Sequence, residues 1–235
     1  MALVRYGGGV VQMSGSLAGN TYARNRSGNY ARARTKPVNP KSSRQSAARL
    51  LLTFLAEQWR DSPMDATIRA AWETYAAAVN WNNALGETIH LTGFQHFLRS
   101  NARRMQAGLT IVTAAPTDLT LPGAILDFTG AGTADDQKIS IAFDDTDPAF
   151  DEDGASLIVH QGLPQEPTHN FFGGPWRYIG EIDGDAITPP TSPVELDAGF
   201  VLTEGQRVWV RGSIARADGR VSAFFEAASF LVAAS

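Results

Sequence analysis

The spacing of apolar residues changes twice along this chain of 235 residues. Residues 1–39 are rich in Gly, Ser, Asn and Arg and hold few large aliphatic side chains, so this segment cannot close a hydrophobic core alone. Residues 40–109 place apolar residues at helical spacing, and residues 110–235 contain short apolar runs with the period of strands. We therefore expect an α+β protein with an extended N-terminal arm, a helical domain and a C-terminal β domain.

Alternation between Tyr or Arg and Ala predicts a β-hairpin within the arm, with Ser27-Gly28 as its turn. One face of the first strand then carries Tyr22, Arg24 and Arg26. The same face continues on the second strand with Tyr30, Arg32 and Arg34. The alanines Ala23, Ala31 and Ala33 face the other way. Because an isolated two-stranded hairpin is marginally stable in water, we expect it to rest on another element.

Three helices are predicted from apolar stripes and from their end signals. Asn39-Pro40 is typical of a helix N-cap followed by proline at the first helical position, and an apolar stripe continues from there as far as Trp59. Ser62-Pro63-Met64-Asp65 predicts the start of the second helix, in whose stripe Trp72 is central. Thr92 and Gln95 form a third capping box, and Gly108 is placed to end that helix. The stripes are Ala47, Ala48, Leu51, Phe54, Leu55 and Trp59, then Ile68, Ala71, Trp72, Tyr75, Ala76 and Val79, then Phe94, Phe97, Leu98, Ala102 and Met105.

The C-terminal segment predicts an antiparallel β-sandwich of immunoglobulin-like or fibronectin-like architecture, because short strands and turn signals recur without a helical run between them. The expected strands cover residues 138–143, 155–160, 176–182, 206–213 and 221–225. Their apolar residues repeat without any need for the helices. We therefore expect residues 110–235 to fold alone.

Charge is divided unevenly between these segments. Residues 1–50 carry a net charge of +9 with no acidic residue, residues 51–109 are balanced, and residues 110–235 carry −13. This asymmetry predicts that the arm has a task separate from that of an acidic globular body. The chain begins without an apolar run of signal-peptide length, and none of its apolar runs approaches the span of a bilayer. We therefore expect no membrane partner and synthesis in the cytoplasm.

The sequence holds no catalytic motif that we recognise. It has no cysteine, which excludes disulfides, thiolate zinc sites and a cysteine nucleophile. It also lacks paired histidines at metal-ligand spacing, a Ser nucleophile elbow and a phosphate-binding loop. We expect neither an enzyme nor a cofactor.

An acidic stretch at residues 144–154 is the weak candidate for a metal site, through Asp147, Asp151 and Asp153. Calcium prefers oxygen ligands at such density, but the spacing is not that of an EF-hand. A solvated, self-repelling loop is the favoured interpretation. We therefore expect the stretch to be indifferent to metal.

The basic arm is the strongest functional feature. Its small-residue face and strand edges favour strand addition to a neighbouring protein, whereas its Tyr and Arg residues also suit nucleic acid. A merely solvated tail is the third interpretation, although such a tail needs no regular alternation. Because like charges repel, we expect residues 1–39 to be mobile in the free protein and ordered in its assembly.

Several stretches resemble an uncharacterised group of tailed-bacteriophage and prophage proteins. They are Met13-Ser-Gly-Ser-Leu-Ala-Gly-Asn-Thr-Tyr-Ala-Arg24, Gly28-Asn-Tyr-Ala-Arg-Ala-Arg34, Pro37-Val-Asn-Pro40, the helix to Trp59, Ala71-Trp72 and Leu91-Thr-Gly-Phe94. The resemblance covers about residues 8–115 and brings no catalytic motif. It implies a structural component of a virion.

These observations together predict a minor capsid or decoration protein of a phage particle, anchored by its arm. The expected partners are other virion proteins, capsid or neck subunits, with homo-oligomers in the particle and nucleic acid as the alternative partner of the arm. A neck or tail protein is one alternative function. A surface or glycan-binding module that uses Phe171, Phe172 or Trp176 is another.

Overall fold

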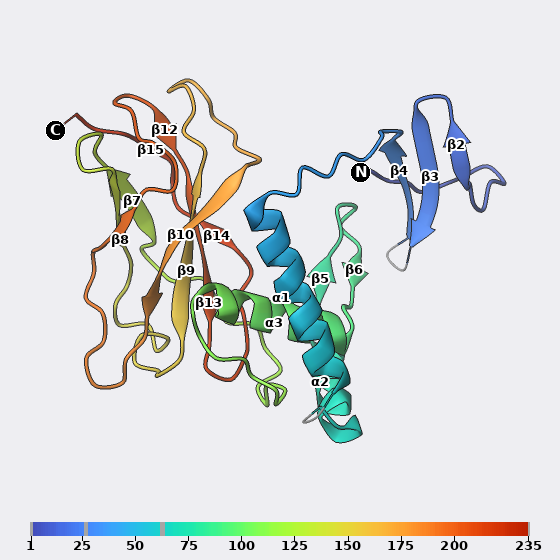
Figure 1. Ribbon diagram of the computed structural model, residues 1–235, viewed down its shortest axis with the longest axis horizontal. Helices are drawn as coiled ribbons and strands as arrows, with labels where there is room; N and C mark the ends of the chain where they lie inside the picture. The colour runs from blue at the N-terminus through green and yellow to red at the C-terminus, as the bar shows by residue number, and fades with distance from the viewer. Residues whose placement is uncertain (1, 26–27, 62–63, 235) are drawn as a thin grey trace.

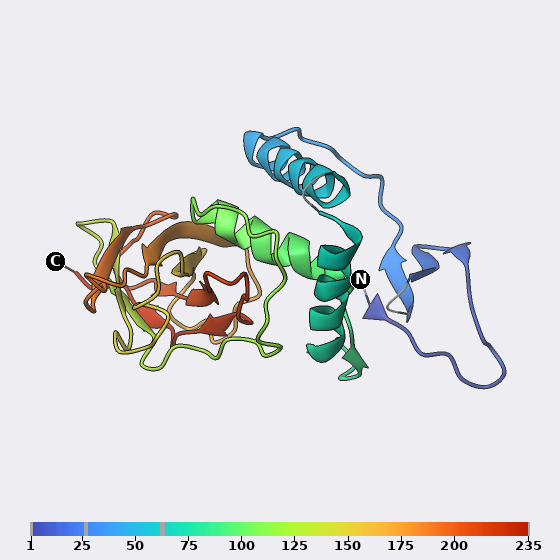
Figure 2. The same cartoon turned by 90° about the horizontal axis from the view of Figure 1, so that it is seen from below.

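The computed structural model describes residues 2–25, 28–61 and 64–234. Within these residues the fold is mixed α+β, with three α-helices and several antiparallel sheets. An N-terminal sheet and the C-terminal β region, residues 110–235, lie at opposite ends of the molecule (Figures 1 and 2). The helices lie between them, so the chain passes from one end to the other.

The N-terminal sheet contains the predicted hairpin and two further strands. Its strands are β1 (Ala2–Leu3), β2 (Gly15–Leu17), β3 (Asn20–Asn25) and β4 (Gly28–Ala33). They are antiparallel in the order β1-β4-β3-β2. Asn25 pairs with Gly28, so Gly28 belongs to a strand and not to the turn that we expected at Ser27-Gly28.

A linker of residues 34–42, without regular secondary structure, joins β4 to α1 (Ser43–Arg60). Ser42 caps α1, and its Oγ accepts a hydrogen bond from the Gln45 N–H at 3.3 Å. The cap expected at Asn39 is wrong. The side-chain oxygen of Asn39 instead accepts hydrogen bonds from the Arg49 guanidinium (3.0 Å) and the Lys41 N–H (3.3 Å), and the helix begins later.

The second helix, α2 (Ala66–Ala78), is capped by Asp65, whose carboxylate accepts a hydrogen bond from the Ile68 N–H at 2.8 Å. The predicted cap residues 62–63 lie outside the described residues. After α2, the two short strands β5 (Trp81–Asn82) and β6 (Thr88–Ile89) pair as a hairpin. This hairpin leads the chain back to the third helix.

The third helix, α3 (Gly93–Gln106), starts as predicted. The Thr92 hydroxyl accepts a hydrogen bond from the Gln95 N–H, and the Gln95 side chain accepts one from the Thr92 N–H. This reciprocal pair satisfies two backbone donors that the helix leaves free. The helix ends before Gly108, which has a φ of +66° in the left-handed region that favours glycine.

The helices share a core around Trp72. Its ring is fully buried and meets Tyr75 and Phe97 edge-on, and its Nε1–H donates a hydrogen bond of 2.8 Å to the Thr113 carbonyl. The position predicted for Trp72 is therefore confirmed. The other buried members of this core are Leu55, Met64 and Val79.

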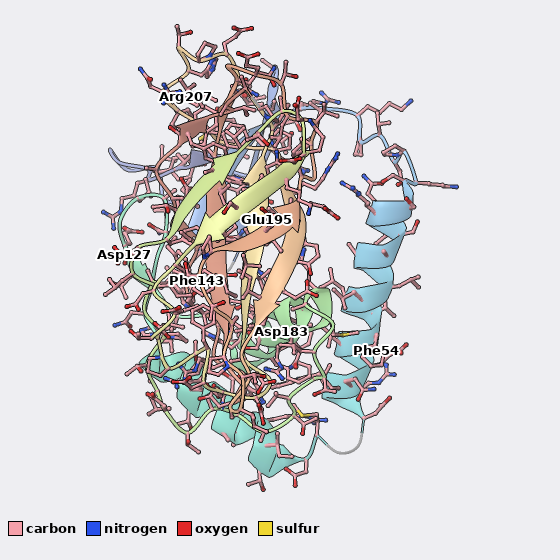
Figure 3. All side chains as sticks on the ribbon, turned by 90° about the vertical axis from the view of Figure 1, so that its left-hand side faces the viewer. Phe54, Asp127, Phe143, Asp183, Glu195 and Arg207 are labelled. Carbon is pink, nitrogen blue, oxygen red and sulfur yellow. The ribbon has the colours of Figure 1, made fainter. Side chains whose placement is uncertain are left out.

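The predicted apolar stripe of α1 is only half used. Leu51, Leu55 and Trp59 pack into the helical core, whereas Ala47 and Ala48 are exposed. Phe54 is 38% exposed and lies on the side of α1 that faces away from the β region (Figure 3). Phe54, Ala47 and Ala48 of the predicted stripe therefore lie outside the buried core, although the helix itself is present.

The C-terminal β region forms three antiparallel sheets around one apolar core. Its strands are β7 (Thr129–Gly132), β8 (Lys138–Ala142), β9 (Ser156–Gly162), β10 (Trp176–Asp183), β11 (Val194–Asp197), β12 (Arg207–Val208), β13 (Val210–Ala215), β14 (Phe225–Glu226) and β15 (Phe230–Leu231). The sheet orders are β10-β9-β13-β14, β11-β8-β7 and β12-β15. Ile139 and Ile141 of β8 and Leu157 and Val159 of β9 belong to the shared core.

Three of the five predicted strands are present with small shifts at their ends, as β8, β9 and β10. The strand predicted at 206–213 is divided into β12, which pairs with β15, and β13, which pairs with β9 in another sheet. The predicted strand at 221–225 is wrong over most of its length, since only Phe225 lies in a strand. Val221 instead forms a single antiparallel bridge with Ala215. The strands β7, β11 and β15 were not predicted, because they are short and depend on their partners in the sheet.

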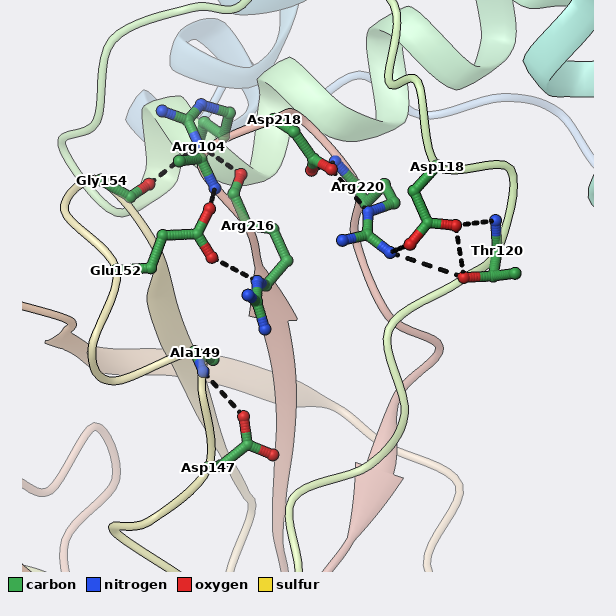
Figure 4. A network of polar contacts seen from close by, with 11 residues as sticks. Arg104, Asp118, Thr120, Asp147, Ala149, Glu152, Gly154, Arg216, Asp218 and Arg220 are labelled. Atoms are coloured by element: carbon green, nitrogen blue, oxygen red, sulfur yellow. Dashed lines mark hydrogen bonds and ion pairs between the residues drawn. The ribbon is translucent and has the colours of Figure 1, made fainter.

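Arg104 at the end of α3 joins the helices to the β region. Its side chain is only 3% exposed and donates hydrogen bonds to the carbonyls of Gly154 (3.0 Å) and Arg216 (2.7 Å) (Figure 4). It also donates one to the Thr110 carbonyl (2.8 Å) in the segment that follows the helix. This buried guanidinium of α3 is thus satisfied by backbone oxygens that all lie beyond the boundary expected at residue 109.

Two further arginines of α3 extend this contact. Arg99 donates hydrogen bonds to the carbonyls of Val221 and Ser222, and Arg103 donates one of 2.8 Å to the Ser213 hydroxyl. The helix therefore covers part of the outer face of the β10-β9-β13-β14 sheet.

Candidate interaction surfaces

The predicted partner-binding residues lie in the central hairpin of the N-terminal sheet and just after it. Tyr22 and Arg24 belong to β3, and Tyr30 and Arg32 belong to β4. Arg34 is the first residue of the linker, and Arg26 lies outside the described residues. The tyrosines are half-buried, whereas the side chains of Arg24, Arg32 and Arg34 are exposed.

The two Tyr/Arg rows of this hairpin point to opposite faces of the sheet. Tyr22 pairs with Ala31, and Tyr30 pairs with Ala23. Cross-strand partners share a face, so each face carries one Tyr/Arg row, with its tyrosine opposite an alanine and its arginine opposite Asn29 or Thr21. The expectation of a single Tyr/Arg face is therefore wrong. In the observed register, even-numbered residues of β3 share a face with odd-numbered residues of β4. Tyr22 and Tyr30 are both even-numbered, so they lie on opposite faces.

The N-terminal sheet has no core of its own. None of the described residues from 2 to 42 is buried. Leu17 of β2 is exposed, and so are Val10, Val11 and Val38 in the segments next to the sheet. Its backbone pairing is thus not supported by apolar burial, which is the main source of stability in a folded sheet.

The sheet touches the rest of the molecule at the β5–β6 hairpin. Arg5 forms an ion pair with Glu87, and Asn83 donates a second hydrogen bond of 3.1 Å to the same carboxylate. A small cavity of about 170 Å³ lies beside this pair, between Leu3 and Leu85. Arg5 is 83% exposed in its side chain, and exposed ion pairs contribute at most about 1 kcal/mol. The attachment of the sheet to the body is therefore weak.

Both outer strands of this sheet offer free backbone edges. Within the described part of the chain, β1 pairs only with β4, and β2 pairs only with β3. Unpaired N–H and C=O groups on an edge strand are a template for another strand. An additional strand can extend the sheet from either side.

Two carboxylates of the acidic stretch accept hydrogen bonds from backbone N–H groups, one inside the stretch and one in a neighbouring loop. Asp147 accepts a hydrogen bond from the Ala149 N–H (2.8 Å, Figure 4), and Asp153 accepts one from the Ala186 N–H (2.9 Å). Asp151 is exposed. Over residues 2–25, 28–61 and 64–234, no group of three or more acidic or histidine side chains is arranged to hold a metal ion. Indifference of this stretch to calcium stays a prediction.

Contacts between α3 and the β region are the feature that the sequence interpretation missed. Arg99 and Arg103 are four residues apart and so lie on one face of a helix. The sequence shows this spacing, but the charge of residues 51–109 is balanced and gives no sign that these arginines contact another part of the chain. Only the structure shows that their polar partners are backbone and hydroxyl oxygens of the β region.

Two buried histidines are held neutral by their surroundings. Burial lowers the pKa of His160 to about 4, and the charges of Arg103 and Arg211 act in the same direction. Burial also lowers the pKa of His96 to about 4, with a smaller effect from Arg99. Because Nε2 of His96 accepts a hydrogen bond of 3.4 Å from the Trp81 indole, this ring needs its unprotonated form.

Only one of the three aromatic residues of the glycan-binding alternative is freely exposed. Phe171 is 80% exposed. Phe172 stacks on Trp209 at 5.0 Å and meets Trp176 edge-on, and Arg211 lies 4.4 Å above the Trp176 ring. Phe172 and Trp176 therefore serve the packing of the outer sheet face.

No family model, curated protein or solved structure matches this chain. None of the helices in the described residues is long and apolar enough to cross a membrane.

Proposed function

We propose that this protein is a non-enzymatic structural component of a bacteriophage particle, most specifically a minor capsid or decoration protein anchored by its N-terminal arm. One observation carries the proposal: the arm is a basic sheet with no buried residue and with two free edges, at the end of a linker. A sheet without a core gains stability mainly when another surface covers it. The resemblance of residues 8–115 to phage proteins supports the same interpretation.

In this proposal the C-terminal β region is a β-sandwich of immunoglobulin or fibronectin type. Two antiparallel sheets, β10-β9-β13-β14 and β11-β8-β7, contribute side chains to one apolar core, which supports that architecture. Glu195 lies on the face of the β region that is turned away from the helices (Figure 3). The net charge of −13 over residues 110–235 suits the projecting part of a particle protein.

The proposed partners of the arm are neighbouring virion proteins, including further copies of this chain. Strand addition at β1 or β2 would supply the backbone contacts, and the Tyr/Arg rows would contact the partner on both faces of the sheet. This two-sided arrangement favours insertion between two neighbours over attachment to one flat surface.

The decisive experiment is assembly in the phage that carries the gene. Deletion of residues 1–39 should leave a folded protein that is absent from purified particles. The triple change Arg24→Ala, Arg32→Ala and Arg34→Ala should reduce its occupancy, while Arg60→Ala, an exposed arginine on α1, should not. Normal occupancy of the deletion variant would defeat the proposal. The number of copies in each particle then separates a decoration protein from a neck or tail component.

Two other functions make different forecasts for the same variants. If the arm binds nucleic acid, the triple change removes DNA affinity and lowers its salt dependence by roughly one unit of slope for each lost phosphate contact. If the β region binds glycans, Phe171→Ala abolishes glycan binding without any effect on particle occupancy. The exposure of Phe171 is the observation that keeps this second function in consideration.

A further inference from the structure

A groove runs across the body between α1, α3 and β10. One hollow of about 470 Å³ lies between the first half of α1 and the second half of α3. Another of about 380 Å³ lies between α1, the end of α3 and the start of β10. Ala47 and Gln106 line both hollows, which therefore join into one groove, called here the α1–α3–β10 groove.

The floor of this groove is apolar because α1 separates from α3 along its first half. Leu51 packs into the helical core, but Ala47 and Ala48 remain exposed one turn earlier. On the opposite wall, α3 contributes Ala102 and Met105, the latter 36% exposed. The small alanines leave a space that large apolar side chains of another molecule can fill.

All charged residues that line the groove are arginines: Arg44, Arg103 and Arg177. Within the described part of the chain, none of the three forms an ion pair with a carboxylate. Arg103 donates to the Ser213 hydroxyl, and Arg177 donates to the Gly199 carbonyl. Their hydrogen bonds are thus made to neutral oxygens, and their charges are not neutralised.

Positive charge is crowded at the inner end of the groove. Arg103 and Arg211 lie 4.0 and 3.8 Å from the centre of the Phe224 ring, so the two guanidinium groups share one aromatic neighbour. Burial lowers the pKa of Arg103 to about 10, and repulsion from Arg99 and Arg211 adds to the effect. Glu226, which pairs with Arg211 across the strands, is the acidic group that offsets part of this charge. A carboxylate near Arg103 would relieve the remaining repulsion.

We propose that the α1–α3–β10 groove binds an acidic segment of a partner protein, which inserts large apolar side chains between α1 and α3 and places carboxylates beside Arg44 and Arg103. The groove lies in the body, apart from the N-terminal sheet (Figures 1 and 2). The proposal therefore does not depend on the phage function proposed above, and each can fail without the other.

A second copy of this chain does not offer such a segment. Its most acidic stretch, residues 144–154, is folded against the β region, with Ala149 and Phe150 buried in the core. Its N-terminal arm is basic and would be repelled. Bases stack on aromatic rings, and Trp176 and Tyr178 line the β10 part of the groove, but the apolar residues of the larger α1–α3 part are Ala, Leu and Met. Nucleic acid therefore fits that larger part less well, and the test below includes single-stranded DNA.

The test uses the full-length protein and short fluorescent peptides rich in Glu, with Leu residues at helical spacing in one peptide and at alternate positions in another. We expect at least one of them to bind, and we expect replacement of its Glu by Gln to weaken binding about tenfold or more. Ala48→Glu should weaken binding by a similar factor, since it fills the groove and adds a negative charge. Ala56→Glu, at an exposed position elsewhere on α1, is the matched control and should bind like the parent.

Arg44→Glu provides a second variant at the exposed start of α1, in case Ala48→Glu disturbs the helix, and thermal melting checks both folds. Failure of both peptides to bind would overturn the proposal. So would binding that neither Ala48→Glu nor Arg44→Glu weakens. Tighter binding of single-stranded DNA than of the peptides, lost in Arg44→Glu, would assign the groove to nucleic acid instead.

Discussion

Two four-stranded antiparallel sheets in this chain have little in common beyond their backbone pairing. In the sheet β10-β9-β13-β14, every residue of the central strand β9 is buried, because the second sheet covers one face and α3 covers part of the other. In the sheet β1-β4-β3-β2, no described residue is buried. Strand pairing is therefore compatible with either situation, and the side chains decide which sheet belongs to a buried core and which remains without one.

The difference extends to charge. The segment with the N-terminal sheet is strongly basic, and the C-terminal β region is strongly acidic. Leu157 and Val159 of β9 belong to an apolar core. In the N-terminal sheet, by contrast, one face carries Tyr and Arg from β3 and the other face carries Tyr and Arg from β4. Stability should thus reside in the body of the protein, and order in the N-terminal sheet should depend on a partner.

The largest effect should follow from Trp72→Ala. Loss of this buried indole removes edge-on contacts with Tyr75 and Phe97 and leaves the Thr113 carbonyl without its donor. We expect the free energy of unfolding to fall by about 3–5 kcal/mol, measured by denaturant titration or by protease sensitivity. The matched change in the N-terminal sheet, Tyr30→Ala, should alter it by less than about 0.5 kcal/mol. If the Trp72→Ala protein melts like the parent, the expected difference in stability between the helical core and the N-terminal sheet is wrong.

Acid should weaken the body through its two buried histidines. The pKa of His96 and of His160 is about 4 in the folded protein, below the ordinary value of 6.5. The unfolded chain therefore takes up protons first, and the free energy of unfolding falls as the pH drops from 6.5 towards 4. The slope is at most about 1.4 kcal/mol per pH unit for each histidine.

Melting at a series of pH values tests this dependence. His160→Gln should flatten the slope by removing one of the two groups. His169→Gln, a change at an exposed histidine, should leave the slope as it is. An unchanged slope in His160→Gln would mean that this histidine is already protonated in the fold.

A smaller effect is expected when the β region is separated from α3. Its core lies within residues 125–232, so a fragment of residues 110–235 should still unfold cooperatively. It loses the Arg104 side chain, which donates to the Gly154 and Arg216 carbonyls. We expect it to be less stable than a fragment of residues 93–235 by about 1–3 kcal/mol. Equal melting of the two fragments would show that the contact with α3 adds nothing.

Removal of the N-terminal sheet should have the smallest effect on stability. Deletion of residues 1–39 eliminates the exposed Arg5–Glu87 ion pair but no buried contact. We expect a change of less than about 0.5 kcal/mol in the free energy of unfolding of the body. Backbone amides of β3 and β4 should exchange with solvent far faster than those of β9. Comparable protection in both sheets would contradict the distinction drawn between them.

Local signals in the sequence were sufficient where the structure depends on neighbours in the chain. The Thr92–Gln95 capping box and most of the stripe around Trp72 are confirmed, because a helix sets the geometry of residues three and four apart. Ala71 of that stripe is exposed. The start of α1 was misplaced, since Asn39 and Ser42 are both good caps and only their partners decide between them. Short strands such as β11 were missed because they exist only through pairing with β8.

The candidate site could also be predicted only as far as local signals reach, because its partners distant in the chain are not fixed by the local pattern. Alternation located Tyr22, Arg24, Tyr30 and Arg32 on strands, but the faces to which they point depend on register. The arginines of α3 that contact the β region could not be identified either. Arg99 and Arg104 donate to backbone carbonyls distant in the chain, and any residue type supplies a carbonyl. Arg103 donates to the Ser213 hydroxyl, which is equally distant in the chain.

The linker of residues 34–42 determines the reach of the arm. Nine residues extend at most about 30 Å, and Pro37 and Pro40 keep such a chain from collapsing. A tether of this length holds its end at a high local concentration near the body while it permits many relative orientations. Two contact surfaces joined in this way tolerate a variable distance between the bodies that they contact, up to a fixed limit. Shortening or lengthening the tether would move that limit without changing either contact surface.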